Sequence, residues 1–202
     1  MTDTADFTHR CGVSAEHLER LAHVGALASL GLSRRAALWQ VGEVAGRRGP
    51  LFADLPPEVI SPLTEMSPLD ETVADYAGLH LTTGPHLMAY VRKELDRRGV
   101  VPVSALEDIE DGTMVRVAGS VIVRQRPGTA KGFVFLTMED ETGMVQAIIR
   151  PDLFQEHRVF IVGTPVLLVE GPLQKQDGTL SVKARRFEAV QADAAVASHD
   201  FH

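Results

Sequence analysis

Apolar and polar positions alternate most regularly between residues 114 and 150, and this pattern predicts three consecutive β-strands. The first strand has apolar positions at Val115, Val117, Val121 and Val123. Gly119 interrupts it where a strongly bent strand needs a residue without a side chain. The second strand carries Val134, Leu136 and Met138 on one face and Phe133, Phe135 and Thr137 on the other. Residues 140–143, Asp-Glu-Thr-Gly, then predict a hairpin turn.

The pattern downstream of these strands predicts a helix and two more strands. Residues 152–160 have the size of a short helix, residues 165–174 form a fourth strand, and residues 180–189 form a fifth strand after a turn. Three strands, a helix and two strands are the order of an OB-fold, a small barrel that commonly binds oligonucleotides. We therefore predict an α+β chain in which helical segments precede a five-stranded OB-fold barrel. A barrel that serves only as a spacer or protein contact is the alternative.

Upstream of the barrel, the apolar residues follow helical spacing. Ser14 and Ser33 are predicted N-caps of helices over residues 17–22 and 34–45. Two further helices are expected over residues 71–79 and 86–98, the second with Pro85 near its first turn. Their predicted buried positions are Leu18, Leu21 and Ala22, then Ala37, Leu38, Val41 and Val44, and finally Leu87, Tyr90, Val91 and Leu95.

These elements divide the chain into five expected segments. Five prolines between residues 50 and 68 exclude a continuous helix there and favour an extended linker. The expected segments are residues 1–48 (helical), 49–68 (linker), 69–112 (helical connector), 113–190 (barrel) and 191–202 (tail).

The charge distribution bears on the kind of ligand. The 202-residue chain has a net charge of −7, which is unusual for a protein that binds nucleic acid. Residues 113–190, however, hold ten Lys or Arg against eight Asp or Glu, whereas the remainder holds ten against nineteen. The barrel alone has a cationic excess, and its modest size predicts weak, salt-dependent binding. The single cysteine, Cys11, allows no internal disulfide. No signal peptide or membrane span is evident, which favours a cytoplasmic protein.

Basic and aromatic side chains gather on the predicted sheet, as in proteins that bind single-stranded nucleic acid. Arg124, Arg126 and Lys131 are expected on the connection between the first two strands, where they would contact phosphates together with Arg150. Phe133 or Phe135 would stack on bases, although a one-residue register change would exchange the faces of the strand. The candidates of second rank are Arg116, Lys183 and Arg185.

The sequence contains no recognisable catalytic or metal site. The acidic run at residues 139–141 falls in a predicted turn, where carboxylates are normally solvated. His80 and His86 have no Cys or carboxylate at ligand spacing, so helix capping or packing is favoured for them. A Gly-rich phosphate loop and a Ser/His/Asp arrangement are also missing from the sequence. We therefore expect no catalytic residue, cofactor or metal ion.

One long motif resembles a known family. VRVAGSVIVRQRPGTAKGFVFLTMEDETG, residues 115–143, closely resembles the C-terminal OB segment of bacterial C-family DNA polymerases. RQRPGTAKG followed by FLTMEDETG is similar to their error-prone branch, which is associated with DNA repair and translesion synthesis after damage. The chain end, SHDFH, resembles the SRDFH terminus of that branch, with His199 in place of Arg. The resemblance extends from about Val13 to His202.

The resemblance implies a single-stranded DNA-binding portion of an error-prone polymerase. In that family the carboxylates that hold two Mg²⁺ ions lie in a palm domain far upstream, so we expect no polymerase activity from this chain alone. The first helices would correspond to the end of a helix-hairpin-helix region. Gly25, Arg34 and Arg35 would then be remnants of a phosphate contact, but we favour an ordinary helical corner with solvated arginines.

Two further possibilities concern partners. The family often carries a sliding-clamp peptide, Gln-x-x-Leu-Phe, and this chain has Leu51-Phe52 with Arg48 at the Gln position. We interpret this segment as a degenerate motif; the alternative is that the pair anchors the linker onto the fold. Two alternatives to single-stranded DNA binding concern the chain as a whole. It would be either a module that docks polymerase or mutasome subunits or a nonfunctional truncated remnant.

Overall fold

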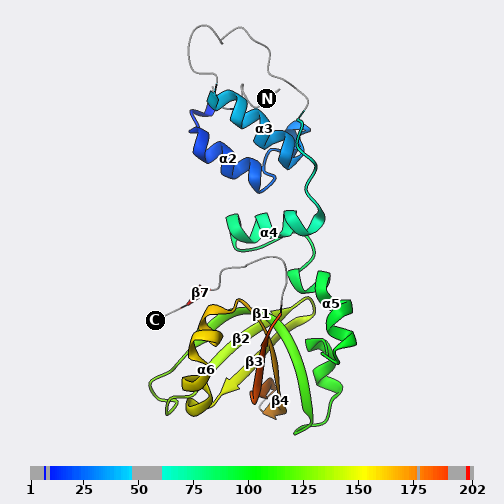
Figure 1. The fold of residues 1–202 in the computed structure, drawn as a ribbon, viewed down its shortest axis with the longest axis vertical. Helices are drawn as coiled ribbons and strands as arrows, with labels where there is room; N and C mark the ends of the chain where they lie inside the picture. Colours follow the sequence, from blue (N-terminus) through cyan, green and yellow to red (C-terminus); the bar gives the residue numbers. More distant parts are fainter. Residues whose placement is uncertain (1–6, 8–9, 47–60, 177, 191–198, 201–202) are drawn as a thin grey trace. The chain divides into compact units, whose positions relative to one another are not determined.

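The computed structural model describes residues 7, 10–46, 61–176, 178–190 and 199–200. The chain divides into two compact units, Met1–Thr83 and Gly84–His202 (Figure 1). The division falls within the segment that the sequence suggests as a single connector. Leu51 and Phe52, the degenerate clamp motif, lie outside the described residues.

The first unit is helical. Its elements are α2 (Ala15–His23), η1 (Ala28–Leu30), α3 (Arg34–Gly46) and α4 (Pro68–Leu79). Both predicted N-caps are confirmed: the side chain of Ser14 accepts a hydrogen bond from the His17 amide, and Ser33 Oγ accepts one from the Ala36 amide at 3.2 Å. The buried apolar residues that hold α2 and α3 together are Leu18, Ala22, Leu27, Ala37 and Val41.

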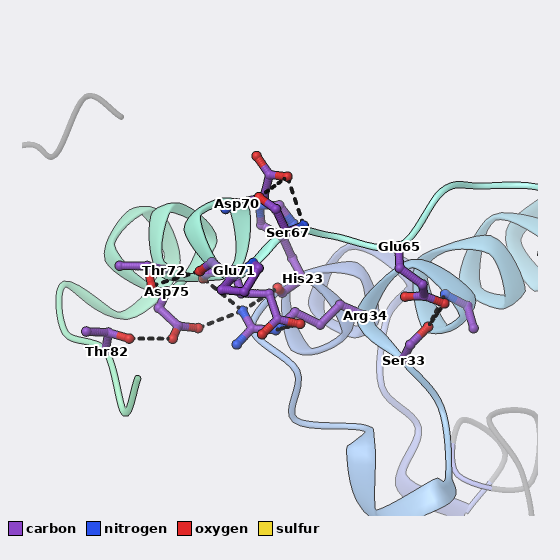
Figure 2. Close-up of polar contacts among 12 residues, drawn as sticks. His23, Ser33, Arg34, Glu65, Ser67, Asp70, Glu71, Thr72, Asp75 and Thr82 are labelled. Carbon is purple, nitrogen blue, oxygen red and sulfur yellow. Dashed lines mark hydrogen bonds and ion pairs between the residues drawn. The ribbon is translucent and has the colours of Figure 1, made fainter. Parts of the chain in front are cut away.

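A capping box starts α4 at Pro68, earlier than the sequence pattern predicts. The Ser67 hydroxyl accepts from the Asp70 amide, and Asp70 Oδ2 accepts from the Ser67 amide at 3.0 Å (Figure 2). The hydrogen bonds from the Ser67 side chain and backbone lower the pKa of Asp70. Ser33 Oγ also donates to Glu65 Oε1 at 2.8 Å, which ties the segment before α4 to the start of α3.

The second unit contains two helical segments followed by the barrel. Its elements are α5 (Leu87–Arg97), η3 (Val103–Asp108), β1 (Met114–Gln125), β2 (Val134–Asp140), β3 (Gly143–Ile149), α6 (Pro151–Gly163), β4 (Val166–Gln176), β5 (Thr179–Lys183) and β6 (Arg186–Ala189). The antiparallel pairs are β1–β2, β2–β3, β4–β5, β4–β6 and β1–β4, and β3 pairs with β5 in parallel. Because these pairings close a ring, the predicted α+β chain with an OB-fold barrel is confirmed (Figure 1).

Two glycines in the barrel lie where another backbone approaches closely. A Cβ at Gly119 would lie 2.6 Å from the carbonyl oxygen of Glu139, so the prediction of a residue without a side chain in β1 is confirmed. A Cβ at Gly171 would lie 2.0 Å from the carbonyl oxygen of Lys183. Only glycine therefore lets β4 pass the end of β5.

A bulge in β1 changes which side chains face the core. Val121 pairs with Met138, but Val123 pairs with Thr137, so one extra residue lies in β1 between these pairs. The expectation that Val123 continues the buried alternation is wrong, because the bulge shifts the pattern by one position. Val123 lies opposite Thr137 on the outer face, and Arg124 turns inward instead.

The predicted fifth strand is two strands, β5 and β6, and the prediction of one continuous strand is wrong. Leu173 pairs with Val182, whereas Glu170 pairs with Arg186, so the chain after β5 has one residue more than the facing part of β4. Pro172 lies in this part of β4 and has no amide hydrogen to donate to a ladder. The interruption lets the chain leave β3 and continue along the first half of β4.

The acidic turn after β2 is packed against α5 and η3, so the expectation that its carboxylates are solvated is wrong for Asp140 and Glu141. Arg92 Nη2 lies 3.1 Å from Asp140 Oδ2, and its Nε pairs with Glu141. Asp140 also accepts from the amides of Val103 at 2.9 Å and Thr142 at 2.7 Å. Burial disfavours the charged guanidinium, but the carboxylates of Glu141, Asp140 and Asp96 together outweigh burial and raise the pKa of Arg92.

His86 caps α5. Its Nδ1 accepts from the Met88 amide at 3.2 Å, and its Nε2 lies 3.7 Å from Glu139 Oε2. Pro85 therefore precedes the N-cap instead of lying in the first turn.

Near the other end of the chain, the backbone of β7 (His199–Asp200) pairs in parallel with β1 at Val123 and Arg124.

Candidate nucleic-acid interface

One hollow on the barrel brings together four of the residues predicted to contact nucleic acid. Its volume is about 670 Å³. The lining residues are Phe133, Ile148, Arg150, Leu153, Pro172, Lys183, Ala184 and Arg185. Phe133, Arg150, Lys183 and Arg185 belong to the predicted set, although they come from separate parts of the sequence. The other four residues supply apolar surface between them.

Strand pairing brings this set together. Ile148 of β3 pairs with Phe135 of β2 on one side and with Lys183 of β5 on the other. The amide of Ala184 donates to the Ile148 carbonyl at 2.9 Å, and the amide of Arg185 donates to the Glu170 carbonyl at 2.8 Å. The chain thus leaves β3 between Ala184 and Arg185, and the hollow lies where the two strands separate.

The cations of the hollow are available to a ligand. Lys183 and Arg185 are exposed, and within the described parts of the chain no carboxylate forms an ion pair with either. Arg150 Nη2 lies 3.1 Å from Asp152 Oδ2, but both side chains are about two-thirds exposed, at 65% and 68%. Such an exposed pair contributes little and opens readily. Among the described residues that line the hollow there is no carboxylate, so this part of its rim carries an excess of positive charge.

The connection between β1 and β2 adds two more exposed cations, Arg126 and Lys131. Lys131 and Gly132 both have positive φ, 51° and 84°, which turns the chain sharply before Phe133. A Cβ at Gly132 would lie 3.3 Å from Pro151 Cγ and 3.7 Å from Arg126 Nη2. The Arg126 guanidinium therefore lies near the start of α6, whose N-terminal amides add partial positive charge.

The two predicted aromatic residues have different positions. The buried alternation of Val134 and Leu136 places both Phe133 and Phe135 on the outer face of the barrel, half-buried, so neither ring is enclosed in the core. Phe133 precedes β2 and lines the hollow. Phe135 lies inside β2 and is not among the lining residues.

Arg124 is an exception among the predicted cations. Its expected place on the connection is wrong, because it lies in β1 with only 8% of its surface exposed. Its Nε donates to the Ile161 carbonyl at 3.0 Å and its Nη2 to the Thr164 carbonyl at 2.8 Å. The guanidinium thereby satisfies carbonyl groups at the end of α6, which otherwise have no helical partner. The bulge in β1 is the physical cause, since it turns this residue inward.

Arg116 belongs to a different part of the barrel. Its Nε lies 2.8 Å from Glu170 Oε2, and its Nη1 donates to the Arg98 carbonyl at 3.2 Å. Arg98 in turn pairs with Glu188. Both arginines line a second hollow of about 420 Å³, where the carboxylates offset their charge. This hollow therefore lacks the cationic excess of the first.

The expectation of a solvated arginine at the helical corner is wrong for Arg34, which makes internal contacts. Arg34 Nη1 lies 2.7 Å from Asp75 Oδ1 and donates to the carbonyls of His23 at 3.3 Å and Glu71 at 3.2 Å (Figure 2). Thr82 Oγ1 donates to the second oxygen of Asp75 at 2.9 Å. Figure 2 shows the guanidinium between α3 and α4, where it holds these helices together.

Four lining residues were not among the predicted ones: Ile148, Leu153, Pro172 and Ala184. The sequence feature that could have indicated this apolar lining is Ile148, an isoleucine at an outward position of β3 next to the buried Ala147 and Ile149.

Across the described ranges, no three His, Cys, Asp or Glu side chains cluster as metal ligands. Among the helices in those ranges, none is long and apolar enough to span a membrane.

Comparison with known proteins defines the class of the barrel. Residues 115–190 match the family described as OB-fold nucleic acid binding domain. Asparaginyl-tRNA synthetase from Pyrococcus horikoshii aligns with 47% of this chain and 24% of its own, with 25% identity and a TM-score of 0.40. The barrel is thus an OB-fold nucleic-acid-binding domain by its strand order and by its sequence.

Sequence relatives extend the assignment beyond the barrel. The chain is 42% identical over 188 residues to the error-prone DNA polymerase of Caulobacter vibrioides, an alignment that covers 90% of the chain and 17% of the relative. It is 38% identical over 205 residues to that of Mycolicibacterium paratuberculosis, covering 99% and 18%. The chain therefore resembles one segment of error-prone DNA polymerases, and it spans less than a fifth of the length of these relatives.

Proposed function

We propose that this chain binds single-stranded DNA for an error-prone DNA polymerase and holds the template strand during translesion synthesis after DNA damage. The observation that carries the proposal is the convergence of Phe133, Arg150, Lys183 and Arg185 on one hollow whose described lining residues include no carboxylate. Arg126 and Lys131 lie on the neighbouring connection and extend the cationic surface. We call these six residues the proposed binding surface.

The chemistry of the proposed binding surface favours a single strand over a duplex. Phosphates interact with the exposed cations without regard to base sequence, and this interaction weakens as salt rises. The apolar lining has no partner on a duplex, because paired bases are stacked inside the double helix. An unpaired strand offers both its phosphates and the faces of its bases.

We assign catalysis to polymerase domains outside this chain. The chain corresponds to 17–18% of the polymerases that it resembles, and the described residues contain no carboxylate cluster that could hold metal ions. We propose that it has no polymerase activity alone and acts in the cytoplasm beside catalytic domains. Incorporation of dNTPs on a primed template by the purified chain would overturn this part of the proposal.

A second candidate function, docking of polymerase or mutasome subunits, has one specific observation in its favour. Val159 and Val162 on α6 are 88% and 44% exposed, although valine is usually buried. A role of Leu51 and Phe52 in sliding-clamp binding stays a prediction. Pull-down with polymerase subunits, comparing the chain with a Val159→Ser variant, tests the docking candidate.

Fluorescence anisotropy with labelled single-stranded and double-stranded oligonucleotides tests the main proposal. We expect single-strand binding that is stronger than duplex binding and that falls as salt rises. Absence of single-strand binding even at low salt would contradict the proposal and favour the docking candidate.

A further inference from the structure

We infer that the hollow lined by Phe133 is a subsite for one unpaired nucleobase, which enters it while the flanking phosphates stay on the rim. This inference rests on the proposed function, since it specifies how a bound single strand is held. It adds a requirement that electrostatic binding to a cationic surface does not have: the strand must carry a base at the nucleotide that meets the hollow.

The size and lining of the hollow fit such a group. Its volume of about 670 Å³ lies in the range of about 300–1,000 Å³ that is usual for small-molecule sites. The interior is apolar, with surface from Ile148, Leu153, Pro172 and Ala184 beside the ring of Phe133. A flat heterocycle gains stacking and dispersion contacts there, whereas a phosphate or a sugar alone would leave this surface without a partner.

The rim supplies cations from two separate elements. Lys183 is the last residue of β5 and Arg185 lies two residues further on, whereas Arg150 is the N-cap residue of α6. A strand that inserts one base has a phosphate on each side of the inserted nucleotide. The two groups of cations can therefore neutralise the phosphates before and after it.

The two phenylalanines provide an internal comparison. Phe133 and Phe135 are both half-buried on the outer face of the barrel, and only Phe133 lines the hollow. A general apolar contribution of this face would involve both rings. Base insertion involves Phe133 alone, so the same substitution at Phe135 is a matched control.

The experiment uses the full chain and two oligonucleotides of equal length, oligo-dT and a strand with the same backbone in which every position is abasic. Affinity is measured by anisotropy for the wild type and for Phe133→Ala, Phe133→Leu and Phe135→Ala, with thermal unfolding as a check that each variant is folded. The leucine variant keeps an apolar side chain, so it protects against loss of the fold while it removes the aromatic ring.

We expect Phe133→Ala and Phe133→Leu to weaken oligo-dT binding by about 5-fold to 100-fold, the loss that follows from removing one base–aromatic stack. Neither variant should change binding to the abasic strand, and Phe135→Ala should behave as the wild type with both ligands. Equal losses on both strands, or no loss on oligo-dT, would overturn the inference while leaving single-strand binding intact. Failure of the wild type to bind either strand would instead overturn the proposed function and, with it, the subsite.

Discussion

Arg124 donates from Nη2 to the carbonyl oxygen of Thr164 at 2.8 Å, and this bond joins the end of β1 to the segment that leaves α6. A second bond, from Nε to the Ile161 carbonyl, lies on the same guanidinium. Arg124, which the sequence suggests as a phosphate contact, thus stabilises the barrel. Within the described residues, Lys183 and Arg185 at the hollow form no ion pair.

Replacing Arg124 should therefore affect folding more than binding. We expect Arg124→Met to lower the free energy of unfolding by about 1.5–3 kcal/mol, because buried carbonyl groups lose a charged donor. Urea denaturation measures this change. Arg126→Met is the matched control: its stability should stay within about 0.5 kcal/mol of the wild type, as for other surface substitutions. A stable Arg124→Met variant with impaired DNA binding would contradict the structural role.

Charge reversal at Lys183 should weaken single-strand binding without changing stability. Lys183→Glu places a carboxylate at the rim of the hollow, and the slope of log affinity against log salt should decrease in magnitude by about 0.7 for each lost phosphate contact. Arg158→Glu, an exposed position on α6 that does not line the hollow, changes the net charge equally. Equal effects of the two variants would show that only the overall charge matters.

Arg92 should be essential for the stability of the second unit. In Arg92→Met the Asp140 side chain, which is fully buried, loses its cationic partner, and we expect a loss of about 3–5 kcal/mol. Chemical denaturation of the full chain, followed through the unfolding of the barrel, is the measurement. Arg97→Met is the control, because Arg97 is itself exposed and forms an ion pair with exposed Glu94. A loss no larger than that of the control would show that the acidic turn does not need α5.

The capping box of α4 should give a pH-dependent contribution to stability. The pKa of Asp70 is lowered below 3.8 by the hydrogen bonds from Ser67, so the charged carboxylate favours the folded state. The contribution is present above pH 3.8 and is lost as pH falls through the lower pKa of the folded state. The melting temperature of Asp70→Asn should lie below that of the wild type at neutral pH, and the two should converge well below pH 3.8. A difference that persists in acid would contradict this origin.

The order of strands and helices could be predicted because local signals agree with the fold. Alternation in β2, the turn after Asp140 and the serine caps are each decided by neighbours in the sequence. The inward turn of Arg124 could not be predicted, because the bulge depends on how β1 pairs with β2. Asp140 was similarly misjudged, since its partner Arg92 lies 48 residues away.

The candidate site shows the same distinction. Phe133, Arg150, Lys183 and Arg185 could be selected individually by residue type and predicted face. Their meeting at one hollow depends on the parallel pairing of β3 with β5 and on the departure of the chain from β3 after Ala184. Neither feature leaves a local pattern in the sequence, and the apolar lining residues were therefore missed.

Photocrosslinking tests the location of the binding surface most directly. A single-stranded oligonucleotide with 5-bromouracil at successive positions is bound to the full chain and irradiated, and the crosslinked peptides are mapped by mass spectrometry. Our account predicts crosslinks within residues 126–133 and at residues 183–185, with loss of the latter group in Lys183→Glu. Crosslinks confined to the helical residues 15–46, or to the second hollow around Arg116, would contradict it.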